Sequence, residues 1–103
     1  MTTSELRIAV VGVGLIGGSI ALAARERTGA TVSGYDRSAD ALRAAVGRGA
    51  VDEAADGIAT AVQRAQAVFV AVPVGDLDEV VSEALESAPS DCVVTDVGST
   101  KRT

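Results

Sequence analysis

The sequence predicts an α/β protein with a doubly wound, mostly parallel sheet and helices on both faces. Short apolar runs alternate with longer amphipathic segments along the 103 residues. The short runs are continuously apolar, which is typical of parallel strands covered on both faces. Repeated strand–helix–strand units imply right-handed crossovers. The order of these elements predicts strand order 3-2-1-4-5, with a ligand at the switch between strands 1 and 4.

Four segments have the length and composition of buried strands. They are rich in β-branched residues, and each ends in Gly, Asp or Pro. These segments are residues 7–13, 31–36, 67–73 and 92–97. A weaker segment at residues 50–55 is expected to hold a short edge strand. Cys92 is expected to be a buried packing residue.

Helices are expected between these strands. The first spans residues 16–27 and ends at Gly29, a typical residue after a helix C-terminus. Ser38 occupies the N-cap position of the second helix, and residues 58–64 form a third. The apolar stripe of the second helix is Leu42, Ala45 and Val46.

The clearest helical period in the chain lies in the segment between the fourth and fifth strands. Apolar residues recur there at helical spacing, and acidic residues occupy the opposite, solvent side. The apolar set is Leu77, Val80, Val81, Ala84, Leu85 and Ala88, and the acidic set is Asp78, Glu79, Glu83 and Glu86.

Composition restricts the class of protein. Hydrophobic residues make up 48% and aromatic residues only 2%, so the core must be built from Val, Ala, Ile and Leu. The net charge of −5 argues against nucleic-acid or membrane partners, because both favour clustered Lys and Arg. No apolar run approaches the ~18 residues of a membrane span. A single cysteine suits a reducing compartment, so the cytoplasm is expected. No metal is expected.

The glycines that follow the first strand form the pattern G-x-G-x-x-G at Gly12, Gly14 and Gly17. Between a strand and a helix, this pattern predicts a Rossmann-type dinucleotide site. Gly12 allows the tight turn, Gly14 lets a pyrophosphate approach the backbone, and Gly17 lets the helix pack against the strand. Leu15 and Ile16 complete the cofactor-binding loop at the helix N-terminus. The alternative is a glycine turn made only for packing.

Asp36 closes the second strand, 19 residues after Gly17. An acid at this position accepts hydrogen bonds from the adenosine ribose and repels a 2′-phosphate, so NAD is expected and NADP is less favoured. Arg37 weakens this inference because a guanidinium could pair with a phosphate. The alternatives are a turn residue at Asp36 and a solvated surface residue at Arg37.

The fourth strand ends at the same expected crevice. Val72, Pro73 and Val74 are candidates for an apolar wall beside the cofactor. The alternative is that they only end the strand and form a turn.

Two segments together resemble the prephenate and arogenate dehydrogenase family. They are "VGVGLIGGSIALAAR" near the start and "DVGSTK" at residues 96–101, supported by "VSGYDRS" and "AVPV". The resemblance implies NAD-dependent oxidative decarboxylation of a small substrate on the route to tyrosine. It implies that Ser99 lies beside the nicotinamide and the substrate hydroxyl, and that Lys101 holds that loop or interacts with an anionic substrate. The alternative for Ser99 is a helix N-cap.

The chain contains no histidine, although removal of a hydride from an alcohol is aided by a base. The resemblance implies a histidine just beyond this chain and a helical part that dimerises and binds the substrate carboxylates. We therefore expect residues 1–103 to be an incomplete dinucleotide-binding domain, truncated from a longer homodimeric enzyme and not catalytically competent alone. The side of the fifth strand should then be partly bare.

Two other functions remain open at this stage. One is a stand-alone NAD-binding module without turnover. The other is a different small-substrate NAD(P)-dependent dehydrogenase, such as a β-hydroxyacid dehydrogenase or an imine reductase. The segment "DVGSTK" argues against the second, by resemblance only.

Overall fold

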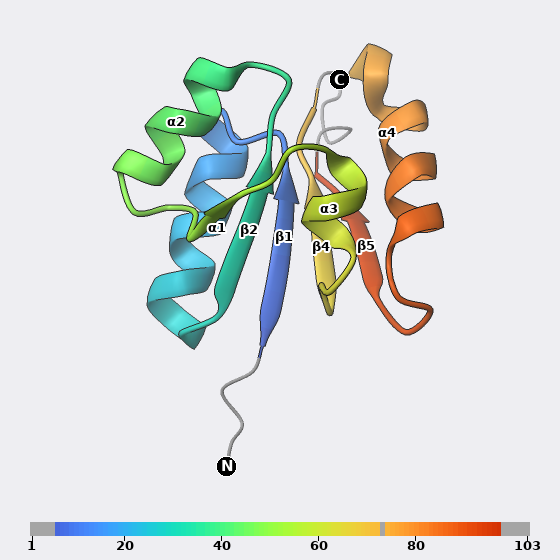
Figure 1. Cartoon of the computed structure of the whole chain (residues 1–103), viewed down its shortest axis with the longest axis horizontal. Helices are drawn as coiled ribbons and strands as arrows, with labels where there is room; N and C mark the ends of the chain where they lie inside the picture. The colour runs from blue at the N-terminus through green and yellow to red at the C-terminus, as the bar shows by residue number, and fades with distance from the viewer. Residues whose placement is uncertain (1–5, 73, 98–103) are drawn as a thin grey trace.

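The sheet has five strands in the order β3-β2-β1-β4-β5, and every pairing is parallel. This computed structural model describes residues 6–72 and 74–97, shown in Figure 1. The predicted strand order is therefore confirmed. The strands are β1 (Arg7–Val11), β2 (Thr31–Tyr35), β3 (Glu53–Ala54), β4 (Ala67–Val70) and β5 (Val93–Asp96).

The predicted strand segments extend past the observed ends of β1, β2 and β4. Apolar residues continue beyond β1 and β4, and Asp36 follows β2, but the backbone leaves the sheet at these points, as at Gly12, where φ is +93°. Residues 12–13, 36 and 71–72 therefore lie in turns at the carboxyl edge of the sheet. These turns form the candidate site described below.

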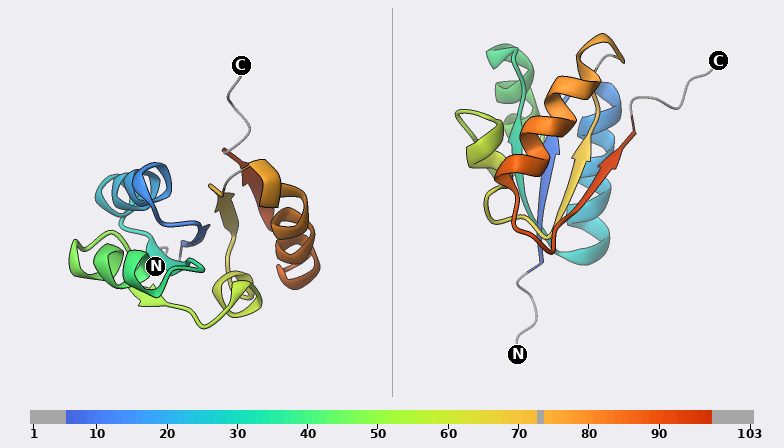
Figure 2. Two further views of the ribbon diagram at one scale, coloured as in Figure 1. Left: turned by 90° about the horizontal axis from the view of Figure 1, so that it is seen from above. Right: turned by 90° about the vertical axis from the view of Figure 1, so that its right-hand side faces the viewer.

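Four helices connect the strands and cover both faces of the sheet. They are α1 (Leu15–Thr28), α2 (Ala39–Gly47), α3 (Ile58–Val62) and α4 (Val74–Ser87). Figures 1 and 2 show α1 and α2 on one side of the sheet and α3 and α4 on the other. This arrangement is the doubly wound architecture predicted from the sequence.

Two predicted helix-end signals act as expected. Gly29 follows α1 in the left-handed conformation at φ +71°, and its amide donates to the Arg25 carbonyl. The Ser38 hydroxyl accepts a hydrogen bond of 3.1 Å from the Ala41 amide at the start of α2. Local sequence therefore sets these two boundaries.

The core lies on both faces of β1, the central strand. Ile8 and Val10 belong to the cluster beneath α1 and α2, while Ala9 and Val11 belong to the cluster beneath α3 and α4. Successive strand side chains point to opposite faces, so one continuous apolar run supplies both clusters. Among the described residues, no polar or charged side chain is buried.

Three apolar side chains, two on helices and one on a strand, are more exposed than the apolar pattern of their segment predicts. Val46 is 41% exposed because α2 packs on β3, an edge strand of two residues. Leu85 is 58% exposed because α4 covers only the edge pair β4 and β5. Val93 on β5 is 62% exposed, which agrees with the expectation of a partly bare fifth strand. Cys92, expected to be buried, is only partly so.

Within residues 6–72 and 74–97, no helix has the length and apolar character needed to cross a membrane.

Candidate functional site

A cleft of about 470 Å³ lies at the carboxyl edge of the sheet. It opens where β1 and β4 lie side by side while their following helices go to opposite faces. In open α/β sheets this switch point is where ligands bind. The lining residues are Val11, Gly12, Tyr35, Asp36, Arg37, Ser38, Ile58, Ala71, Val72, Glu79, Val80 and Glu83.

Gly12 makes the turn that ends β1 and forms one edge of the cleft. Its φ of +93° disfavours any other residue, and its amide donates a 2.7 Å hydrogen bond to the Tyr35 carbonyl. A Cβ at this position would lie closer than 3.0 Å to the carbonyl oxygen of Ala71. Glycine is therefore required at position 12 by the protein itself, as a tight turn next to β4.

Gly17 brings α1 against the end of β1. A Cβ here would lie far inside 3.0 Å of the Gly12 carbonyl oxygen and 3.3 Å from Cγ1 of Val10. Any side chain would push the helix away from the strand. Glycine at position 17 is also required by packing within the protein.

Gly14 differs from these two glycines. It is the exposed N-cap of α1, its φ is −71°, and a Cβ there would have no atom within 4 Å. Among the described residues, no atom beyond the adjoining chain would contact a side chain at this position, so packing does not explain the glycine. A ligand that approaches the backbone here does explain it.

The first turn of α1 begins directly after Gly14. The first amides of a helix have no acceptor within the helix, and Gly14 has no side chain to supply one. The first turn, which starts at Leu15 and Ile16, also contains no acidic residue that would oppose an anion. The helix dipole favours a negative charge at this end. The residues present therefore fit a diphosphate group.

Asp36 ties the glycine turn to the turn between β2 and α2. Its Oδ2 accepts a 2.9 Å hydrogen bond from the Val13 amide, and its Oδ1 accepts a 2.8 Å bond from the Ser38 amide. A carboxylate has about four acceptor sites, so both oxygens keep capacity for hydroxyl donors. Two backbone amides thus hold the Asp36 carboxylate in position at the cleft.

The opposite wall of the cleft is apolar. Val72, predicted to lie there, does line the cleft after β4, together with Ala71. Ile58 at the start of α3 and Val80 on α4 extend this wall. An apolar slot beside an anchored carboxylate suits a nucleoside, whose base is flat and whose ribose carries hydroxyl groups.

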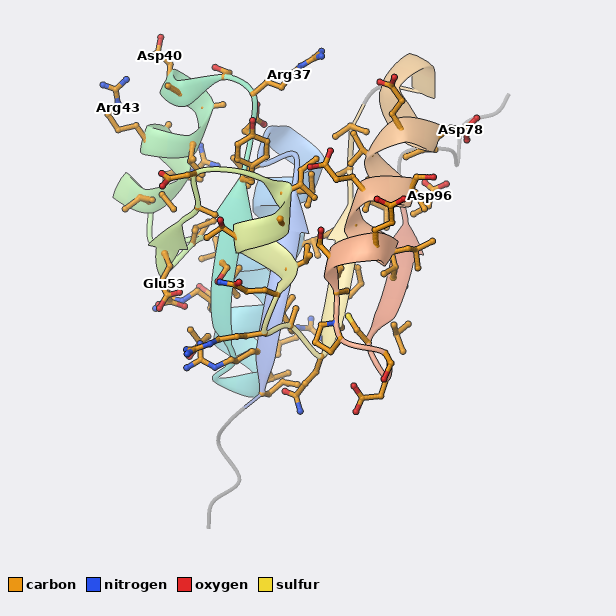
Figure 3. All side chains as sticks on the ribbon, turned by 45° about the vertical axis from the view of Figure 1, so that its right-hand side comes forward. Arg37, Asp40, Arg43, Glu53, Asp78 and Asp96 are labelled. Atoms are coloured by element: carbon orange, nitrogen blue, oxygen red, sulfur yellow. The ribbon has the colours of Figure 1, made fainter. Side chains whose placement is uncertain are left out.

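Of the remaining predicted site residues, one lines the cleft, one begins α4, and three lie outside the residues that the structure describes. Arg37 lines the cleft, and in Figure 3 its side chain extends outward at the edge of the molecule. Val74 begins α4. Pro73, Ser99 and Lys101 lie outside the described residues.

Sequence reasoning missed several residues that line the cleft. Val80 belongs to the apolar stripe of α4 and was expected only in the core, while Ile58 was expected only in a helix. Glu79 and Glu83 were expected on the solvent side of α4. They are exposed, but they also line the cleft, together with Tyr35 and Ser38. Helical period alone does not reveal that one edge of α4 borders the cleft.

Comparison with known proteins agrees with this geometry. Residues 20–103 match the family model described as prephenate dehydrogenase, nucleotide-binding domain. Prephenate dehydrogenase of Bacillus subtilis (strain 168) is 38% identical over 100 residues, which cover 92% of this chain and 26% of that protein.

Two solved structures share both fold and sequence with the chain. The arogenate dehydrogenase of Synechocystis has a TM-score of 0.84 and 33% identity, over 93% of this chain and 34% of that one. The prephenate dehydrogenase of Aquifex aeolicus, in complex with hydroxyphenyl propionate and NAD+, has a TM-score of 0.85 and 30% identity. That match covers 98% of this chain and 36% of the Aquifex chain. The chain thus spans about a quarter to a third of these relatives' length.

Proposed function

The chain belongs to the prephenate dehydrogenase nucleotide-binding domain family, and from this premise we propose that it binds NAD as part of a prephenate or arogenate dehydrogenase. The observation that carries the proposal is the contrast among the three glycines. Packing accounts for Gly12 and Gly17, whereas Gly14 borders open space at a helix N-terminus. A ligand diphosphate is the simplest reason for that glycine.

Each part of the cofactor has a matching group in the chain. The first-turn amides of α1 hold the diphosphate, and Asp36 accepts hydrogen bonds from the adenosine ribose hydroxyls. Ile58, Val72 and Val80 supply apolar contact for the adenine. When bound, the nicotinamide supplies the acceptor for a hydride removed from the substrate.

The residues of the chain position the reaction. Because Asp36 links β2 to the glycine turn through the Val13 amide, it holds the ribose and diphosphate subsites in one arrangement. We further propose, from the family resemblance, that Ser99 lies near the nicotinamide and the substrate hydroxyl. Lys101 is proposed to hold that loop or to interact with the anionic substrate.

The wider setting is proposed on the same premise. Residues 1–103 form the dinucleotide-binding part of a longer enzyme, which acts in the cytoplasm on prephenate or arogenate in tyrosine biosynthesis. A helical part of that enzyme completes the substrate site and forms a homodimer. The greater length of the relatives supports this proposal.

Isothermal titration of the chain with NAD and with NADP tests the cofactor assignment. We expect NAD to bind at least about tenfold more tightly, a difference of about 1.4 kcal/mol. Asp36→Ala should weaken NAD binding and narrow the gap, since it removes both the hydroxyl acceptor and the charge. The control is Asp40→Ala on α2, an exposed acid that does not line the cleft.

Because Asp36 also accepts two amide bonds, circular dichroism must show that the variant is folded. Asp36→Asn, of the same shape, serves as the second variant. If a folded Asp36→Ala bound NAD as tightly as the parent chain, the ribose assignment would be wrong. If the parent bound neither nucleotide at millimolar concentration, the proposed function would be wrong.

A further inference from the structure

We infer that Glu79 and Glu83 of α4 form an acidic wall that excludes the 2′-phosphate of NADP from the cleft. This inference rests on the proposed function. It adds to Asp36 a second determinant of the preference for NAD over NADP, which lies on α4, far from Asp36 in sequence. It gives a role to two side chains whose spacing alone indicates only a solvated helix face.

Glu79 and Glu83 line the cleft at its α4 edge, and they also line a shallow surface hollow together with Asp78 and Glu86. Glu79 and Glu83 are four residues apart, so they stand one turn above the other on the same helix face. Both line the cleft, as does Val80, the neighbour of Glu79 in sequence. Asp78, the other neighbour of Glu79, does not line the cleft and points outward in Figure 3. One edge of α4 therefore borders the cleft.

The two glutamates decide the net charge of the cleft lining. The charged side chains that line it among the described residues are Asp36, Arg37, Glu79 and Glu83. At the end of β2, the negative charge of Asp36 is adjacent to the positive charge of Arg37, so that edge is close to neutral. The two glutamates make the cleft net negative.

The surroundings allow this charge to act over the width of the cleft. Ile58, Val72 and Val80 give it low-dielectric walls, which weaken screening between charged groups. A 2′-phosphate adds nearly two negative charges to the ribose, whereas NAD carries only hydroxyls there. Carboxylates offer no hydrogen-bond donor to that phosphate. The repulsion therefore falls more heavily on NADP, because both nucleotides share the diphosphate and only NADP carries the additional phosphate.

The test measures binding of NAD and NADP to the full chain by isothermal titration calorimetry. The variants are Glu79→Gln, Glu83→Gln and the double variant, each of which keeps the side-chain shape. The matched control is Glu86→Gln, an exposed glutamate one turn further along α4 that does not line the cleft. Asp78→Asn is a second control on the outward side of the helix.

Each single glutamine variant should bind NADP about three- to tenfold more tightly, and the double variant more than tenfold. The affinity for NAD should stay within about twofold, and both controls should leave both affinities unchanged. Raising the salt concentration should narrow the NAD-to-NADP gap of the parent chain more than that of the double variant, because salt screens the repulsion.

An unchanged ratio of the two affinities in the double variant would overturn the inference while leaving NAD binding by the parent intact. An equal loss of NAD and NADP affinity would also overturn it, because the glutamates would then contact the part that both nucleotides share. If the parent chain failed to bind NAD, the proposed function would fail first, and this outcome is visible before any variant is made.

Discussion

Replacing Gly14 and Gly17 one at a time separates the needs of the fold from those of the ligand. Gly17→Ala places a Cβ far inside 3.0 Å of the Gly12 carbonyl oxygen, so α1 must move away from β1. Gly14→Ala places a Cβ where no atom lies within 4 Å. The first change should damage the fold, and the second should damage only binding.

The structure sets the expected magnitudes. Overpacking costs about 1–3 kcal/mol and more when backbone must shift, so Gly17→Ala should cost about 3 kcal/mol. Alanine in a helix recovers about 0.5–1 kcal/mol, which offsets only part of this. In a domain of this size each kcal/mol lowers the Tm by about 4–8 °C, so the net loss of stability should lower the Tm by about 8–20 °C. Gly14→Ala should change the free energy of unfolding by less than about 1 kcal/mol.

Urea unfolding followed by circular dichroism measures stability, and calorimetric titration with NAD measures binding. We expect Gly14→Ala to weaken NAD binding at least about tenfold, because its methyl group takes the space left for the diphosphate. Gly47→Ala is the matched control. Gly47 lies within α2 and does not line the cleft, and a Cβ at this position would have no atom within 4 Å. This substitution should stabilise the chain slightly and leave NAD binding unchanged.

Two results would contradict this reasoning. If Gly14→Ala lowered stability as much as Gly17→Ala, packing would explain all three glycines. If a stable Gly14→Ala bound NAD as tightly as the parent chain, the diphosphate would not lie at this helix end.

Three further predictions follow from single contacts. Ser38→Ala removes the N-cap of α2 and should cost about 1 kcal/mol in urea unfolding, whereas Ser38→Asn should retain most of the stability. The ion pair of Arg25 and Asp52 spans 2.9 Å and is partly exposed, and Arg25 also donates to the Gly49 carbonyl, so Arg25→Met should cost about 1 kcal/mol. Asp52→Ala should cost more, about 1–3 kcal/mol, because it also leaves the Val32 amide without its 2.8 Å acceptor; equal losses from both changes would contradict this. Burial raises the pKa of the Cys92 thiol, so iodoacetamide should alkylate Cys92 more slowly than free cysteine at about pH 7.5. The rate should increase as the pH rises past the usual thiol pKa. A rate faster than that of free cysteine would contradict a raised pKa.

The sequence by itself predicted the strand order, through the alternation of strands and helices and the general rules for doubly wound sheets, and it marked two helix boundaries through local signals. Continuous apolar runs predicted parallel strands buried on both faces, and Ser38 and Gly29 marked helix boundaries that the structure reproduces. Gly12, Gly14 and Gly17, placed between a predicted strand and a predicted helix, predicted the glycine turn that joins them. The two helix ends and the glycine turn depend on residues that are close in sequence, so no distant contact is needed to predict them.

Only the tertiary structure decided which side chains share the cleft and which apolar residues stay exposed. Glu79 borders the cleft because α4 packs across β4 and β5 at one particular rotation, and helical period does not encode that rotation. Leu85 is 58% exposed although it belongs to the apolar stripe of α4, which helical period does not reveal, whereas the exposure of Val93 agrees with the partly bare fifth strand expected from the sequence. Helical period likewise does not reveal the bond of the Val13 amide to Asp36, which joins segments 23 residues apart. Local chemistry specifies the elements, whereas the packing of distant segments specifies what each side chain meets.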